Sequence, residues 1–344
     1  MVKTIECAGT PYQIGFTHGS EAAGEIVGSI AFYTDLFMKY SKKTWPEVQE
    51  VARSFDLEIR AKWPRYHAEL QGIADGSKHD ILDIVAINVR TEIAFGLFSD
   101  GCTSLFWETP EHVFLGQNWD WMEEQKANII VLTIKQESFP AIKMVTEGGI
   151  IGKIGINSAG VGVCLNAIRT KGLDVSRMPV HLGLRSVLES SSAKEAVAKL
   201  EGVGMAASAH MLIGDASGEA VGLEFTKSTF AKLKKDDLGT IVHSNHLLVD
   251  HAGLKDPAWM KDSLERFQRM TALTQKYVGK GPSLEEFSAL FQDESGYPGA
   301  ICRAQVAPST SATLFNIVMD LKSKTAIVKL GRPTAVEETI FMRF

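Results

Sequence analysis

The chain has 344 residues, of which 45% are hydrophobic and 22% charged, and its formal net charge at pH 7 is −5. No apolar run approaches the ~18 residues that span a bilayer, and the mild charge without a basic cluster argues against nucleic acid or an anionic membrane as partner. We therefore expect a protein with an ample core, large enough for a single large domain, that acts on a small molecule.

The N-terminal third is expected to be almost wholly helical. Apolar residues three or four positions apart predict an amphipathic helix over about 46–75, which Pro64 should kink or break in two. The segments 20–40 and 80–98 are also typical of helices.

From Gly101 onward the sequence predicts strands. Short β-branched and aromatic runs bounded by Gly, Asn and Pro cover 102–107, 112–119, 128–134, 141–145, 160–166, 209–214, 220–226, 313–319 and 325–331. Helices are expected at roughly 179–200, 258–278 and 283–292. Strands in hairpin-like succession followed by helices favour an α+β unit with antiparallel sheets covered by helices.

Neither a nucleotide site nor a metal site is indicated. The stretch "GGIIGKIG" at 148–155 lacks the spacing of a phosphate-binding loop and is interpreted as a hairpin turn. His243 and His246 lie three apart, but no second pair of ligands accompanies them, so we expect a turn or the wall of an active site. We therefore predict no metal and no cofactor.

The cysteines point to a reducing compartment. Four of them are widely spaced without a CxxC pair, which favours neither a zinc ribbon nor a disulfide framework: Cys7, Cys102, Cys164 and Cys302. The N-terminus lacks the apolar core of a signal peptide, so an intracellular location is expected.

Cys102 stands apart because it directly follows Gly101, where the helical third ends and the first predicted strand begins. A thiol there can add to the preceding carbonyl, and an N-to-S acyl shift followed by hydrolysis then cuts the chain. Gly101 leaves the approach open and tolerates a strained turn. The product is a new N-terminal cysteine.

Such a cysteine carries its own base. An α-amino group has a pKa of about 7.7 to 8.0 and can take the thiol proton without a histidine. What remains necessary is a group that positions the amine and donors that face the tetrahedral oxyanion. Asp120 and Asn245 fit these two requirements.

A set of motifs in a shared order resembles the isopenicillin-N acyltransferase family, also called acyl-coenzyme A:6-aminopenicillanic acid acyltransferases. The similarity runs from "GTPYQIGFTHGS" to "FMRF" through "RTEIAFG", "DGCTS", "GQNWDW", "IGINSAGVGV", "GMAASA", "GLEF", "SNH", "ATLFNIV" and "LGRPT". It implies a four-layer αββα N-terminal-nucleophile hydrolase sandwich, made as an inactive precursor and cut at Gly101-Cys102 into a small subunit, 1–101, and a large subunit, 102–344.

The resemblance also implies the chemistry. Cys102 would be the nucleophile of both cleavage and transfer, Asp120 would orient its amine, and Asn245 would contribute to the oxyanion hole. The acyl group would come from an amide side chain or from acyl-CoA as co-substrate, and would pass through an acyl-Cys102 thioester to a 6-aminopenicillanic-acid-like amine.

Five further residues fall at or near family positions. Ser104 and Ser309 match family hydroxyls, although a strand hydroxyl and a loop cap are equal alternatives, and Thr226 replaces a serine with its hydroxyl kept. The family has an arginine where this chain has Thr310, so the usual carboxylate clamp is missing. Arg303 could replace it in space or form a surface ion pair.

Three functions are therefore considered. The first is the acyltransferase, the second an amidohydrolase of N-acyl amino acids or small peptides with water as acceptor, and the third an uncleaved binding protein. The chain ends at Phe344 without the peroxisomal tripeptide of the fungal family, which favours a cytoplasmic location.

Overall fold

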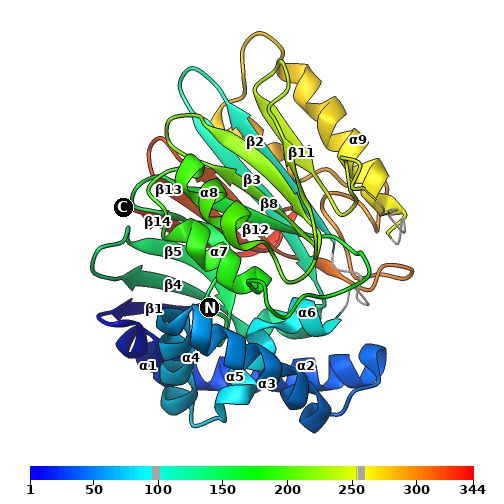
Figure 1. Ribbon diagram of the computed structural model, residues 1–344. Helices are drawn as coiled ribbons and strands as arrows, with labels where there is room; N and C mark the ends of the chain where they lie inside the picture. Colours follow the sequence, from blue (N-terminus) through cyan, green and yellow to red (C-terminus); the bar gives the residue numbers. More distant parts are fainter. Residues whose placement is uncertain (95–100, 253, 255–259) are drawn as a thin grey trace.

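Two β-sheets packed face to face form the centre of the molecule (Figure 1). The computed structural model describes residues 1–94, 101–252, 254 and 260–344. Within them, the eight-stranded sheet has the order β1-β4-β5-β6-β7-β8-β9-β10. Its strands are β1 (Lys3–Ala8), β4 (Ile129–Lys135), β5 (Ile142–Glu147), β6 (Ile154–Asn157), β7 (Gly162–Ala167), β8 (Ala209–Gly214), β9 (Ala220–Phe225) and β10 (Phe230–Leu233).

The six-stranded sheet has the order β11-β2-β3-β12-β13-β14. Its strands are β11 (Thr240–His243), β2 (Cys102–Glu108), β3 (Val113–Trp121), β12 (Ala312–Asp320), β13 (Thr325–Arg332) and β14 (Ala335–Arg343). Every pair of neighbouring strands in the two sheets is antiparallel except β1 and β4. The antiparallel arrangement predicted from the hairpin-like succession is therefore confirmed for all pairs but this one.

Helices cover the outer faces and one end of the sheets. In the described residues they are α1 (Pro11–Glu21), α2 (Ala23–Ser41), α3 (Trp45–Lys62), α4 (Pro64–Ser77), α5 (Ile81–Asn88), α6 (Arg90–Ala94), α7 (Val180–Leu188), α8 (Ala193–Val203), α9 (Asp262–Thr274) and α10 (Leu284–Leu290), with short 3-10 turns at Glu123–Asn128 and Gln275–Tyr277. Helices α7 and α8 pack on the eight-stranded sheet, and α9 and α10 pack on the six-stranded one. This arrangement confirms the predicted αββα layers.

The N-terminal helices follow the sequence pattern closely. The predicted helix over 46–75 is broken at Pro64 into α3 and α4, and its apolar stripe is buried against the core. Thr44 and Glu47 mark the start of α3, where the backbone amide and the hydroxyl of Thr44 both donate to the Glu47 carboxylate, at 2.8 Å and 2.7 Å. The segment 80–98 forms α5 and α6 as far as residue 94, and the rest lies outside the described residues.

The predicted helical N-terminal third is confirmed except at its beginning. Residues 3–8 form β1, which joins the edge of the eight-stranded sheet through its parallel pairing with β4. A strand of six residues is too short for its alternation to stand out, and its partner lies far along the chain. The helix expected over 179–200 is two helices, because Ser192 caps a new start at α8.

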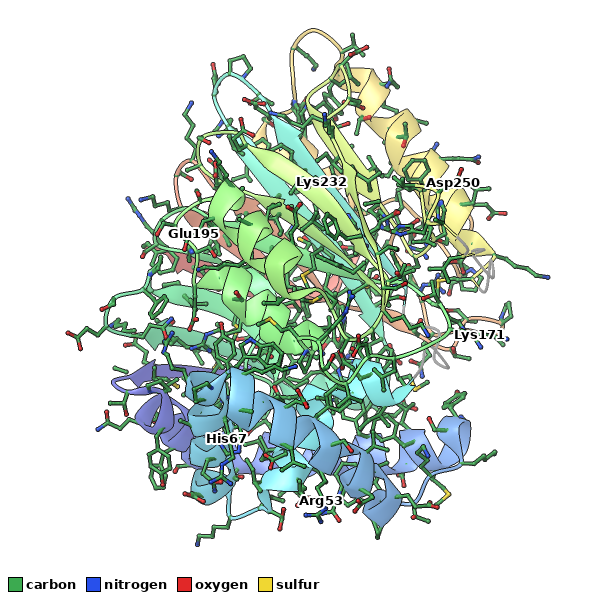
Figure 2. The ribbon with its side chains drawn as sticks, in the orientation of Figure 1. Arg53, His67, Lys171, Glu195, Lys232 and Asp250 are labelled. Carbon is green, nitrogen blue, oxygen red and sulfur yellow. The ribbon has the colours of Figure 1, made fainter. Side chains whose placement is uncertain are left out.

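Most charged side chains lie at the surface of the molecule, and apolar side chains lie between the layers. Exposed charged residues such as Arg53 and Lys171 project from the edge of the molecule (Figure 2). A single large apolar cluster fills the space between the layers, and a smaller one lies beneath α9 and α10. Over the part of the chain that the structure describes, no helix combines the length and apolar character that crossing a bilayer requires.

Candidate active site

Cys102 is the first residue of β2 and lies inside the molecule, with 1% of its surface exposed. Its cross-strand partner on β3 is Trp119. Side chains alternate between the two faces of a strand, so Cys102 and Ser104 share a face. The Ser104 hydroxyl donates to Asn166 Oδ1 on β7, at 2.7 Å. The Cys102 side chain therefore projects toward the eight-stranded sheet.

The peptide bond between Gly101 and Cys102 is held at both polar atoms. The carbonyl oxygen of Gly101 accepts the backbone amide of Asp120 at 2.9 Å. The amide of Cys102 donates to Asn245 Oδ1 at 2.8 Å. A Cβ added to Gly101 would lie 2.6 Å from Arg303 Nε and 2.7 Å from Asp120 Oδ2, so a larger residue would collide there.

Asp120 lies on the other face of β3 from Trp119, beside Gly101. Its carboxylate is fully buried and accepts the hydroxyl of Thr313 at 2.6 Å. Arg303 Nε is 3.4 Å from its second oxygen. Burial raises the pKa of Asp120 to about 7, against the opposing effect of the Arg303 guanidinium.

Arg303 is buried at the site and not at the surface, since 3% of its side chain is exposed. Its Nη1 donates to the hydroxyl of Ser309 at 3.0 Å, and its Nη2 to Asp262 Oδ1 at 2.6 Å. Although burial opposes ionisation, Arg266 and Arg303 hold the pKa of Asp262 below its usual value. The guanidinium thus orders Asp120, Asp262 and Ser309 around it.

Arg266 on α9 is a site residue that the sequence reasoning missed. Its Nη1 donates to the Cys102 carbonyl at 2.6 Å, and its Nη2 to Asn245 Oδ1 at 2.8 Å. Its Nε also binds Asp262, four positions earlier on the helix. A charged i,i+4 pair on a helix is the available signal, but such pairs are usually exposed, and nothing in the spacing marks this one as buried.

The hydroxyls of the remaining predicted residues lie in different surroundings. Thr310 is exposed, next to Ser309, whose hydroxyl donates to the carbonyl of Ser311 at 2.9 Å. The Thr226 hydroxyl accepts the amide of Thr229 at 2.9 Å and serves the turn after β9. The structure therefore brings Ser309 to Arg303, whereas Thr226 serves this local turn.

The two histidines of "HSNH" point to different partners on either side of Asn245. His243 binds Glu224 at 2.9 Å and stacks on His210, with ring centroids 3.5 Å apart. His246 contacts the hydroxyl of Ser263 at 2.7 Å. Within the described ranges, no three or more His, Cys, Asp or Glu side chains lie together so that they could hold a metal ion.

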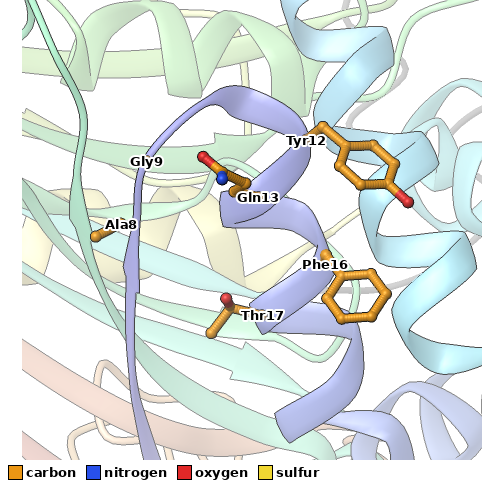
Figure 3. A pocket seen from close by; sticks show the side chains of 6 residues that line it. All are labelled: Ala8, Gly9, Tyr12, Gln13, Phe16 and Thr17. Atoms are coloured by element: carbon orange, nitrogen blue, oxygen red, sulfur yellow. The ribbon is translucent and has the colours of Figure 1, made fainter.

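A surface hollow of about 640 Å³ lies elsewhere, at the junction of β1 and α1 (Figure 3). Its lining residues are Ala8, Gly9, Tyr12, Gln13, Phe16 and Thr17. None of them contributes to the arrangement around Cys102, so this hollow is separate from the candidate site.

Comparison with known proteins gives one family. The model of the acyl-coenzyme A:6-aminopenicillanic acid acyl-transferase family matches residues 107–335. The 40 kDa form of acyl-coenzyme A:6-aminopenicillanic-acid-acyltransferase from Emericella nidulans is 44% identical over 345 residues, covering 99% of this chain and 96% of the relative.

Two solved structures extend the comparison. A cysteine-to-alanine mutant of conjugated bile acid hydrolase from Clostridium perfringens is 15% identical with a TM-score of 0.50, over 71% of this chain and 92% of that one. Penicillin V acylase from Agrobacterium tumefaciens is 13% identical with a TM-score of 0.47, over 71% and 86%. The likeness to the bile acid hydrolase, together with the two sheets, bears out the predicted N-terminal-nucleophile hydrolase fold.

Proposed function

Because the chain belongs to the acyl-coenzyme A:6-aminopenicillanic acid acyl-transferase family, we propose that it is a self-processing cysteine acyltransferase. Its acyl group would pass through a Cys102 thioester to an amine like that of 6-aminopenicillanic acid. The observation that carries the proposal is the peptide bond before Cys102, whose oxygen and nitrogen both have hydrogen-bond partners at 2.9 Å and 2.8 Å.

In the cleavage step, the Cys102 sulfur adds to the carbonyl carbon of Gly101. The amide of Asp120 donates to the oxygen that becomes the oxyanion, and such a donor is worth on the order of 3 kcal/mol in the barrier. The C–N bond then breaks, the nitrogen of Cys102 takes up the proton lost by the thiol, and a thioester remains. Water hydrolyses it to the carboxylate of Gly101 and the free thiol.

After cleavage, the α-amine of Cys102 would lie between Asp120 and Asn245. It takes the thiol proton as the sulfur attacks an acyl-CoA or an amide, and it returns a proton to the leaving thiol or amine. The Asp120 carboxylate orients this amine. Asn245 Nδ2 donates to the carbonyl of Ala167 at 3.0 Å, so its oxyanion role requires that this bond be exchanged for the substrate.

Hydrolysis is the second candidate, and Thr310 is the observation that favours it. The guanidinium that the family places there is missing, and Arg303 is committed to Asp262 and Ser309. Without a guanidinium at this position, a carboxylate-bearing acceptor loses a bidentate partner. Water could then take the acyl group from N-acyl amino acids or small peptides.

The proposed subunits are 1–101 and 102–344, and their contacts support a cut that leaves them together. The first segment supplies β1 to the sheet that the second segment builds. Arg185 of the second segment binds Glu69 of the first at 2.8 Å, with both side chains buried. The subunits of one precursor would thus be each other's partner.

The test is the intact mass of freshly purified protein under denaturing conditions, beside Cys102→Ala. We expect fragments 1–101 and 102–344 only when the cysteine is present. A single full-length mass in both samples, persisting for days in folded protein, would overturn self-processing and favour the binding protein. If cleavage occurs, turnover of phenylacetyl-CoA with and without 6-aminopenicillanic acid separates transfer from hydrolysis, because only transfer yields more amide than free acid.

A further inference from the structure

A buried ionic cluster lies beside the site, where the N-terminal helices meet the eight-stranded sheet. Its centre is Glu147, the last residue of β5, which accepts Arg90 of α6 at 3.1 Å. Lys153 and the hydroxyl of Tyr33 donate to the two oxygens of the same carboxylate. Gln125 adds a bond at 3.0 Å. The side chains of Glu147 and Lys153 are wholly buried.

Within the described residues, Glu147 is a single carboxylate that Arg90 and Lys153 share. Glu92 interacts with Arg90, but burial raises its pKa to about 7, so it supplies at most part of a charge at neutral pH. His181 also faces the two cations, and burial holds its pKa well below the usual value, so its ring is neutral. Burial disfavours the charged form of Lys153, and an anion nearby favours it.

Cys102 is the ionisable group placed to supply that anion. The Lys153 ammonium lies 3.5 Å above the ring of Trp119. Trp119 is the direct cross-strand partner of Cys102, so both side chains project from the same face of the sheet, as neighbours. A Cys102 thiolate and Lys153 attract each other, and the thiolate raises the pKa of the lysine. Cys164 also faces Cys102, but burial raises its pKa well above the usual value.

From this juxtaposition we propose that Lys153 is a positioning residue, whose buried ammonium over Trp119 favours the thiolate of Cys102 when it attacks Gly101. The inference rests on the proposed function, in which Cys102 is the nucleophile. It addresses a gap in that mechanism: before the cut, the nitrogen of Cys102 is an amide and cannot act as a base. A buried cation that lowers the cost of losing the thiol proton compensates for the missing amine.

The pH range of the effect follows from the lysine itself. Burial lowers the pKa of Lys153 to about 7, against the opposing effect of Glu147. The ammonium is therefore present below about pH 7 and disappears above it. Its help to the thiolate should be largest at neutral and mildly acidic pH and vanish in alkali, where the thiol ionises unaided.

The test measures cleavage rates by intact mass over about pH 6 to pH 10 for the wild type, Lys153→Met and Lys153→Arg. We expect Lys153→Met to cleave about tenfold more slowly near pH 7, with rates converging in alkali, and Lys153→Arg to stay within about threefold of the wild type. Arg185→Met is the matched control, because it removes another buried cation, which is paired with Glu69 and Glu189 and not with Glu147. It should lower the melting temperature without changing the pH profile.

If the wild type is cleaved before purification, the same variants are compared by the alkylation rate of Cys102 against pH, followed peptide by peptide, with buried Cys164 as reference. An unchanged pH profile in folded Lys153→Met would refute the role of Lys153. The same change of pH profile in Arg185→Met would also refute it, because the effect would then not be specific to this lysine. Should Lys153→Met not fold, Lys153→Arg decides, since a loss of about tenfold in this folded variant contradicts a role for charge. Failure of the proposed function is distinct, because the wild type itself then stays uncut.

Discussion

The backbone amide of Asp120 donates a 2.9 Å hydrogen bond to the carbonyl oxygen of Gly101. It continues the pairing of β2 with β3 by one residue beyond the start of β2. The ladder thus fixes the carbonyl that Cys102 would attack, and the carboxylate of the same aspartate lies beside it. Asp120 thus supplies a backbone donor to the carbonyl of Gly101 and places its carboxylate next to the same residue.

Gly101→Ala is expected to slow cleavage by tenfold or more, because a Cβ there would lie 2.6 Å from Arg303 Nε and 2.7 Å from Asp120 Oδ2. With alanine at this position, the carbonyl of Gly101 and the carboxylate of Asp120 cannot both keep their present positions. Intact mass against time measures the effect. Gly202→Ala is the control, since nothing lies within 4 Å of its Cβ and the exchange in α8 should stabilise by about 0.5 kcal/mol. Equal cleavage in the two variants would contradict the steric argument.

Arg303→Lys is expected to lower both the free energy of unfolding and the transfer rate. An ammonium cannot reach Asp120, Asp262 and Ser309 together as the guanidinium does, and breaking a buried ion pair costs about 3 kcal/mol. Urea unfolding of the Cys102→Ala background measures the stability. Arg53→Lys, at an exposed pair with Glu50, should change it by less than about 0.5 kcal/mol. A loss in Arg303→Lys no larger than in Arg53→Lys would show that the buried network is not needed.

Asp120 should make the stability of the uncut chain depend on pH, because burial raises its pKa to about 7. The raised pKa favours the folded state below the ordinary value of 3.8, and this contribution is lost as pH rises through about 7. In the uncut Cys102→Ala background, the melting temperature should therefore fall over that range relative to the same background with Asp120→Asn. Parallel curves for the two proteins would contradict the raised pKa.

Thr310→Arg is expected to lower KM for an acceptor that carries a carboxylate, because Thr310 is exposed and a guanidinium there can bind both oxygens. The expected gain is about tenfold, with kcat little changed. An acceptor of similar size without the carboxylate is the control and should show no gain. A rise in rate for both acceptors would indicate a general effect on the site and not a restored clamp.

Much of the fold could be predicted from the sequence because its elements carry local signals. The break at Pro64 and the nine strand runs follow from proline geometry and residue type. Five strands of the two sheets were not predicted, namely β1, β6, β10, β11 and β14. All but β6 are edge strands, and a strand with a weak local pattern is defined by its partner. Residues 3–8 pair with residues 130–135, which lie far along the chain, and no local sequence pattern predicts such a pairing.

The candidate site likewise contains some residues that could be predicted from the sequence and others that could not. Cys102, Asp120 and Asn245 could be named because each has a chemical task in one mechanism, and the structure brings their backbones and side chains together. Arg266 and Lys153 could not, since their importance lies in burial beside Cys102. Lysine and arginine are usually solvated, and only the fold shows where one is not.

Strand β1 gives the proposed cut a lasting consequence. While the chain is continuous, β1 finds β4 within one molecule, and refolding does not depend on concentration. Once residue 101 is separated from residue 102, an unfolded protein is two chains that must meet again, so recovery becomes bimolecular and falls with dilution. The protein would fold reliably only once, before the cut. After the cut, its lifetime would be set by its rate of unfolding.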